Sequence, residues 1–166
     1  MNTAVSNAVP RAFILLALFV LGFLAYERYE DFSTQREIAR RVQEANRPLY
    51  ERLGGKPAIE TLVDDFIVSQ LVKEPRFQRL FAGAPPELLT KIRNHVVDQL
   101  CEATGGPCKY TGRDMRTTHK GMAVTEDDWN VTMGLLQASM DRLKVHPREQ
   151  EELKAIIATT KSSIVE

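Results

Sequence analysis

The stretch PAIETLVDDFIVSQL, residues 57–71, places apolar side chains at intervals of three and four. This spacing predicts a helix with one apolar face, and Pro57 suits the first turn of such a helix. Further along the chain, the same periodicity predicts helices over residues 87–103, from Thr125 onward and after Pro147. No stretch alternates between apolar and polar residues, as a half-buried strand would. The sequence therefore predicts an all-α domain of about four main helices with short connectors.

Upstream of this domain, the sequence divides into three segments of different character. After an N-terminal tail of residues 1–11, residues 12–26 read AFILLALFVLGFLAY and contain neither a charge nor a proline. A helix of that length rises about 22 Å, somewhat less than the ~30 Å of a hydrocarbon core. Residues 27–48 are rich in charges of both signs, and Glu37 and Arg41 have the spacing of a helical ion pair.

We interpret residues 12–26 as an uncleaved transmembrane anchor and residues 27–48 as a solvated helical stalk. The apolar run could also belong to a signal peptide, but its end offers no pair of spaced small residues for cleavage. A buried core helix is the weaker interpretation, because the run is apolar on all faces. The folded domain is predicted to occupy residues 49–166.

Composition and motifs exclude several classes of function. The 166-residue chain carries 22 Lys and Arg against 22 Asp and Glu, which argues against nucleic acid as a partner. It has no glycine-rich phosphate loop, no Gly-x-Ser-x-Gly elbow and no His-Glu-x-x-His pair. The carboxylates Asp64-Asp65 and Asp127-Asp128 are interpreted as surface and helix-cap residues. What remains is three histidines in an all-α domain, and a histidine beside an apolar face can bind haem iron.

Three segments of the domain resemble one protein family. They are LYERLGGKPAIETLVDDF at residues 49–66, PRFQRLFAG at residues 75–83 and TGGPCKYTGRDMRTTHKGM at residues 104–122. In this order they resemble the group I truncated haemoglobins, short globins with a two-over-two helical sandwich. The resemblance runs from Leu49 to Val165, so it covers the domain but neither the anchor nor the stalk. It implies haem b as the cofactor.

The resemblance also implies roles for individual residues. His119 matches the proximal histidine that ligates the haem iron, and Met115 matches a residue packed on the same side. Phe81 matches the phenylalanine that stacks on the haem, while Phe66 matches one that lines the distal pocket. A neutral imidazole gives iron one strong ligand and leaves the opposite position open to a diatomic gas.

On the distal side, this sequence departs from the family's pattern. The family commonly has a tyrosine where this chain has Ile67, and its two distal helix positions are here Ile92 and Val96. None of these side chains donates a hydrogen bond, so bound oxygen would lack its customary stabiliser, and fast release or autoxidation is expected. His95 is the polar residue nearby. Some relatives use a histidine here as a sixth iron ligand, but it could equally be a solvated residue at the helix edge.

We therefore expect the protein to bind a diatomic gas reversibly, with oxygen, nitric oxide or carbon monoxide as the ligand. The main alternative is an enzyme, either a nitric oxide dioxygenase or a peroxidase-like protein. Because the chain carries no flavin or nicotinamide domain, such an enzyme would need an external reductase. A third alternative is a bis-histidine haem module for redox chemistry or sensing, which requires His95 on the iron.

Two cysteines bear on the compartment of the domain. Cys101 and Cys108 flank a Gly-Gly-Pro turn and could be unrelated thiols, but a turn can bring their Cα atoms within the ~4.4–6.8 Å that a disulfide needs. CEATGGPC also resembles a subset of truncated globins with export signals, and disulfides belong to oxidising compartments. The positive-inside rule points the other way. Arg11 alone precedes the apolar run and several arginines follow it, which favours a cytoplasmic domain. We favour a single-pass protein of a bacterial inner membrane with a periplasmic domain.

Overall fold

The computed structural model describes residues 11–166 of the chain, and the side chains of residue 16 and of residues 18–166. The chain divides into two compact units, of which the first ends at Asn46 and the second spans Arg47–Glu166. The predicted N-terminal tail lies outside the described residues, apart from Arg11, where the first helix begins.

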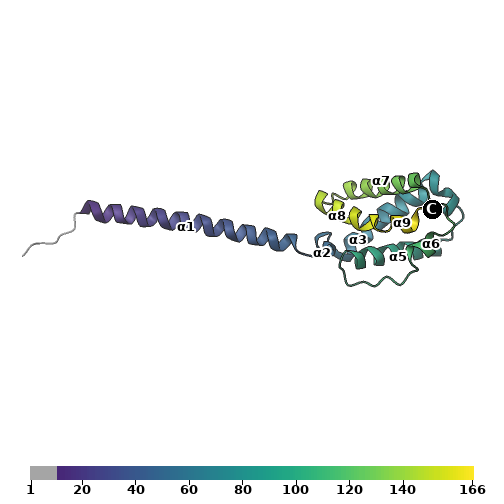
Figure 1. The fold of residues 1–166 in the computed structure, drawn as a ribbon, viewed down its shortest axis with the longest axis horizontal. Helices are drawn as coiled ribbons and strands as arrows, with labels where there is room; N and C mark the ends of the chain where they lie inside the picture. The colour runs from purple at the N-terminus through teal and green to yellow at the C-terminus, as the bar shows by residue number, and fades with distance from the viewer. Residues whose placement is uncertain (1–10) are drawn as a thin grey trace, which may run out of the picture. The chain divides into compact units, whose positions relative to one another are not determined.

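One continuous helix, α1 (Arg11–Ala45), runs through both the predicted anchor and the predicted stalk (Figure 1). The predicted helical ion pair is confirmed, because Arg41 donates to the carboxylate of Glu37 at 2.6 Å. Nearby, the guanidinium of Arg36 lies over the ring of Phe32, 4.2 Å from the ring centroid. Side-chain pairs between neighbouring turns stabilise an exposed helix by about 0.2–0.5 kcal/mol each.

The predicted transmembrane anchor over residues 12–26 is not supported. Among the residues that the structure describes, no helix combines the length and the apolar character that a membrane span requires. The uncharged run stops at Glu27 within α1, well before the helix ends, and by itself it is shorter than a ~30 Å hydrocarbon core. The side chains of residues 12–15 and 17, which belong to this run, lie outside the described residues.

Helices account for the regular structure of the second unit, which confirms the all-α fold class. Three of these helices are irregular, since η1 is a π-helix and η2 and η3 are 3₁₀-helices. In chain order, the helices are α2 (Leu49–Arg52), α3 (Gly55–Val63), η1 (Asp64–Gln70), η2 (Leu71–Lys73), η3 (Pro75–Phe77), α4 (Gln78–Phe81), α5 (Pro86–Ala103), α6 (Met115–His119), α7 (Glu126–Arg142), α8 (Pro147–Ala158) and α9 (Lys161–Ile164).

The longer helices of this unit form two packed layers (Figure 1). α3 and η1 pack against α5 in one layer, and α7 packs against α8 in the other. η1 also contacts α7 and so joins the layers, which is the predicted two-over-two arrangement. The apolar side chains buried between these helices and α2 are Leu49, Ile59, Leu62, Val63, Phe66, Ile67, Val97, Leu100, Cys101, Leu136, Met140 and Leu153.

The first helix of the unit differs from the prediction of one regular α-helix over residues 57–71. After Val63 the backbone widens into the π-helix η1, at whose end the N–H of Leu71 donates to the carbonyls of Ile67 and Phe66. Long-range contacts fix this segment at both ends. The side chain of Gln70 donates to Leu135 O at 3.2 Å and to the hydroxyl of the buried Ser139.

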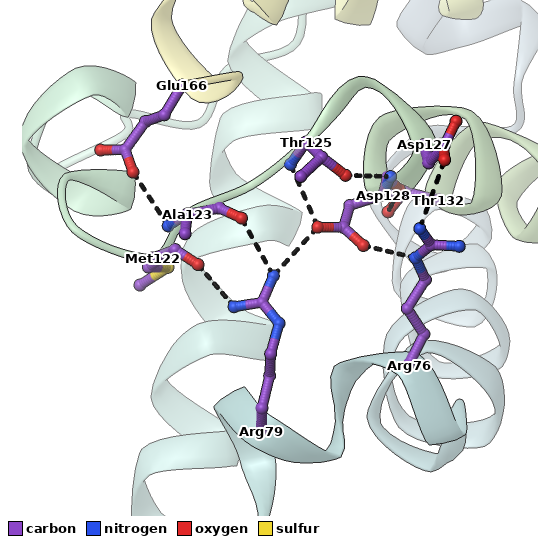
Figure 2. Close-up of polar contacts among 9 residues, drawn as sticks. All are labelled: Arg76, Arg79, Met122, Ala123, Thr125, Asp127, Asp128, Thr132 and Glu166. Atoms are coloured by element: carbon purple, nitrogen blue, oxygen red, sulfur yellow. Dashed lines mark hydrogen bonds and ion pairs between the residues drawn. The ribbon is translucent and has the colours of Figure 1, made fainter.

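Helix α7 begins with a capping box, which confirms the predicted helix-cap role of Asp128. Asp128 N donates to Thr125 Oγ1 and Thr125 N donates to the carboxylate of Asp128, both at 3.1 Å. The expectation of a surface position for Asp128 is wrong, because only 4% of this residue is exposed. Its oxygens also accept from Arg76 Nε at 2.5 Å and from Arg79 Nη2 at 2.9 Å (Figure 2). The Thr125 N–H, followed by the Arg76 guanidinium, lowers the pKa of Asp128 to about 2.

We expect Asp128→Asn to lower the free energy of unfolding at pH 7 by about 2 kcal/mol, because it replaces a buried carboxylate that accepts hydrogen bonds from two guanidinium groups. A folded-state pKa below the unfolded value contributes stability above the unfolded pKa of 3.8, and this contribution is lost as the pH falls toward about 2. Urea unfolding should therefore show a difference between variant and parent that is full at pH 7 and shrinks below pH ~4. The matched control is Asp127→Asn, whose exposed carboxylate lies 3.7 Å from Arg76 and should cost less than about 1 kcal/mol. Equal losses for both variants would contradict this account.

Candidate functional site

Four of the predicted site residues come together on one apolar wall. Phe66 and Ile67 are buried on η1, with 8% and 5% of their surface exposed. Ile92 and Val96 are half-buried on α5. They pack against the core cluster, which contains Phe66 and Ile67. The structure therefore brings together the residues that the sequence assigned to the distal side, and none of the four side chains can donate a hydrogen bond.

An ion pair ties the two helices that build this wall. Arg93, next to Ile92 on α5, donates to both carboxylate oxygens of Asp64 on η1, at 2.7 and 2.9 Å. This guanidinium also holds the pKa of the Asp64 carboxyl below its usual value. Two parallel hydrogen bonds fix orientation as well as distance, so the pair sets how α5 lies along η1.

His119 and Met115 lie together on the short helix α6. Asp114 caps this helix, because its carboxylate accepts from Thr117 N at 2.9 Å. His119 Nδ1 lies 2.8 Å from the carbonyl oxygen of Met115, one turn earlier in the same helix. A carbonyl oxygen only accepts hydrogen bonds, so Nδ1 carries the proton and the lone pair of the imidazole lies on Nε2. Nε2 is therefore the atom of this histidine that can bind a metal.

Two further predicted residues retain exposed apolar surface. Phe81, the last residue of α4, and Met115, the first residue of α6, are half-buried and lie outside the core cluster. Each therefore keeps apolar surface that is free to contact a ligand.

His95 contacts Tyr110, an aromatic residue of the segment 104–122 for which the sequence predicts no role. The rings of His95 and Tyr110 meet edge to face, with centroids 5.9 Å apart and planes at 79°. Tyr110 is fixed in turn, because its hydroxyl donates to Arg113 O at 2.6 Å and its N–H donates to the carboxylate of Glu102 at 3.0 Å. The aromatic ring thus orients His95 on α5.

The connection between α5 and α6 carries a disulfide. Cys101 and Cys108 are joined, with Cα atoms 5.7 Å apart, which is within the range predicted for the turn. The turn between them needs Gly106, because a Cβ there would lie 2.7 Å from the carbonyl oxygen of Cys101 and 2.5 Å from the ring of Tyr50. The disulfide therefore closes the loop that leads from the distal helix α5 to Tyr110 and then to α6.

The remaining histidine has a structural role. His146 is exposed and caps α8, because its Nδ1 accepts from Arg148 N at 3.3 Å and lies 2.9 Å from the carboxylate of Glu149. Within residues 11–166, side chains of His, Cys, Asp and Glu form no cluster of three or more that could hold a metal ion by themselves.

Comparisons with known proteins agree with this architecture. Residues 48–166 match the family model of the bacterial-like globins. The group 1 truncated hemoglobin GlbN of Nostoc commune is 31% identical over 117 residues, which are 70% of this chain and 86% of that protein. The protein of the same name from Mycolicibacterium paratuberculosis is 28% identical over 110 residues, covering 66% of this chain and 78% of that one. Among solved structures, the Fe(III) form of the truncated hemoglobin from Tetrahymena pyriformis gives a TM-score of 0.65 at 24% identity, with 72% of this chain and 98% of that chain covered, which shows the fold.

Two packed layers of helices around one apolar core are the architecture of a truncated globin. The chain belongs to the bacterial-like globin family and, within it, to the group 1 truncated haemoglobins. The cofactor of this family is haem b. The donor set fits that group, since the hydrogen bond to Met115 O leaves Nε2 of His119 without a proton.

Proposed function

We propose that this protein binds a diatomic gas reversibly at a haem whose iron is ligated by His119. The observation that carries the proposal is the hydrogen bond from His119 Nδ1 to Met115 O, which leaves Nε2 as the ligating atom and fixes the plane of the ring. Haem supplies an iron with one coordination position that remains open to oxygen, nitric oxide or carbon monoxide. The chain supplies the proximal ligand and an apolar wall that excludes water.

The distal wall bears on which gas is retained. Ile67, Ile92 and Val96 offer no donor, so bound oxygen gains no hydrogen bond from them and should leave quickly. Gas retention would then depend on the bond to His119 and on the apolar surroundings. Nitric oxide dioxygenase and peroxidase-like activities are the enzymatic alternatives, and both would draw electrons from an external reductase.

We expect the full-length chain to bind one haem per chain and His119→Gly to lose the normal proximal ligation. The glycine variant leaves space for free imidazole, which should restore the parent absorption spectrum because it supplies the same ligand atom. Absorption spectra of the ferric and ferrous forms, with and without imidazole, measure this. The matched control is His146→Asn, which changes the exposed cap of α8 and should leave the spectrum unchanged. An unaltered spectrum in His119→Gly would overturn the assignment.

A second candidate function is a bis-histidine haem in which His95 binds the iron from the distal side. The observation that favours it is the position of His95 on α5, between the apolar wall residues Ile92 and Val96, with no donor on those residues to compete for the site. The contact with Tyr110 would have to break for His95 to reach the iron. An incoming gas would then have to displace His95. The apparent affinity for the gas would fall as the fraction of protein with His95 on the iron rises.

If His95 is a ligand, the ferrous parent should be six-coordinate and low-spin, with gas binding limited by the dissociation of His95. His95→Leu should then give a five-coordinate ferrous haem that binds carbon monoxide faster. Tyr110→Leu, which releases His95 from its ring contact, should increase the six-coordinate fraction. Ferrous spectra and flash photolysis of the carbon monoxide complex measure these changes. A five-coordinate ferrous parent, or equal rates in the parent and His95→Leu, would show that His95 is a bystander.

We also propose that the apolar segment of α1 attaches the chain to a bacterial inner membrane, with the globin unit on the periplasmic side. Large apolar side chains stand exposed from residue 16 to residue 26, among them Phe19 with 74% and Leu21 with 62% of their surface accessible. Lipid could cover this apolar surface without breaking any hydrogen bond of a polar side chain. A disulfide between Cys101 and Cys108 favours the oxidising side of that membrane.

In a bacterial host, we expect the full-length protein to stay in the membrane pellet after carbonate washing, with both cysteines blocked from alkylation until they are reduced. Phe19→Lys should release a measurable part of the protein, because a charge in the apolar segment opposes its burial in lipid. Val42→Lys, at an exposed position on the charged part of α1, is the control and should change nothing. Complete release of the parent would contradict attachment, and free thiols would contradict a periplasmic domain.

A further inference from the structure

The turn that follows His119 has an unusual backbone. Met122 N donates to His119 O at 3.0 Å, so the chain reverses directly after the histidine. Gly121 and Ala123 both have positive φ, at 79° and 50°. A left-handed conformation is strained at alanine and persists only where the surroundings hold it. Contacts from outside the turn must therefore stabilise it.

A carboxylate holds one side of this turn. Gly121 N donates to Glu166 Oε1 at 2.7 Å, and Ala123 N donates to Glu166 Oε2 at 2.9 Å. Each oxygen of the carboxylate thus accepts one backbone N–H. These N–H groups lower the pKa of Glu166, so the side chain is an anion at neutral pH. Glu166 is fixed in turn by its own N–H, which donates to Val124 O at 2.9 Å.

A guanidinium holds the other side of the turn. Arg79, on α4, donates to Met122 O at 2.5 Å and to Ala123 O at 3.2 Å (Figure 2). The same guanidinium is anchored on the buried carboxylate of Asp128 at 2.9 Å. The N–H groups of residues 121 and 123 therefore face an anion, while the carbonyls of residues 122 and 123 face a cation. Charged partners make these among the stronger hydrogen bonds that a backbone can form.

The short helix that carries His119 depends on such support. α6 has five residues, far below the ~12–15 residues at which an isolated helix becomes marginally stable. Asp114 caps its beginning, and the turn held by Glu166 and Arg79 follows its end directly. Movement of that turn would carry His119 O, and with it the backbone of the ligating residue.

We propose that Glu166 and Arg79 are positioning residues for the iron ligand: they clamp the turn after His119 from opposite sides and so fix where Nε2 lies. This inference rests on the proposed ligation of haem iron by His119. Glu166 and Arg79 bind the backbone of the turn. Their effect on the strength and uniformity of the iron–histidine bond therefore passes through the backbone of His119.

The test uses the full-length, haem-loaded protein and the variant Glu166→Gln, in which the amide oxygen can accept only one of the two N–H groups well. We expect a broadened and shifted iron–histidine stretching band in the ferrous resonance Raman spectrum, and loss of haem to a scavenger protein about tenfold faster. Arg79→Gln should act in the same direction through the carbonyls. The matched control is Glu126→Gln, which breaks the 2.6 Å ion pair with Lys161 but touches none of residues 121–123, and should leave both readouts unchanged.

A second experiment, in the His119→Gly protein, separates an effect on the position of His119 from an effect on the stability of the whole domain. In His119→Gly with free imidazole, the ligand is no longer tethered to the turn, so adding Glu166→Gln should leave the iron–imidazole band where it was. An unchanged band in the tethered protein for both Glu166→Gln and Arg79→Gln, with His119→Gly still altering ligation, would overturn the clamp and leave the proposed function intact. If His119→Gly itself alters nothing, the proposed function fails instead. A band that shifts in the untethered background would also overturn the clamp, because the effect would not pass through His119.

Discussion

A helix of five residues is too short to be stable alone, and α6 carries the histidine that we propose as the iron ligand. Its internal contribution is the hydrogen bond from His119 Nδ1 to Met115 O, which selects the tautomer and leaves Nε2 unprotonated. Several further contacts that fix α6 come from residues outside it. Asp114 caps its start, Tyr110 bonds to the carbonyl of Arg113 just before it, and side chains bind the turn after it. The surrounding domain can be understood as the frame that supports one imidazole.

Ion pairs near the surface and apolar side chains in the core hold the helices of the domain together. Asp128 is buried, yet it is satisfied by two arginines and the capping box of α7, so it joins α7 to η3 and α4. Arg93 and Asp64 do the same for α5 and η1. Between these links lie side chains such as Ile59, Leu136 and Leu153, which are almost completely buried. Directional bonds therefore fix how the helices are oriented, while the apolar core supplies cohesion.

Much of the fold was predictable from the sequence, because periodic helices and caps are local patterns. The helix-cap role of Asp128 and the helix pair of Glu37 and Arg41 depend on neighbours within one turn, and both predictions are confirmed. The burial of Asp128 was not predictable, because it depends on Arg76 and Arg79, about fifty positions earlier. The role of Tyr110 beside His95 and the contacts of Glu166 with residues 121 and 123 likewise depend on segments that only the folded chain brings together. Local spacing alone offers no signal for such contacts, although the quoted motif did contain Tyr110.

The π-helix η1 has a consequence for how the distal wall is specified. A π-helical turn encloses one residue more than an α-helical turn, so residues beyond it are rotated relative to a regular helix. In an α-helix, each residue advances by about 100° around the axis, and the loss of a single position within η1 would turn every later side chain of that helix by about that angle. Gln70 would then no longer face Ser139, and Ile67 would leave the wall that it shares with Ile92. The number of residues between Val63 and Leu71, and not only their identity, is therefore part of what encodes the site.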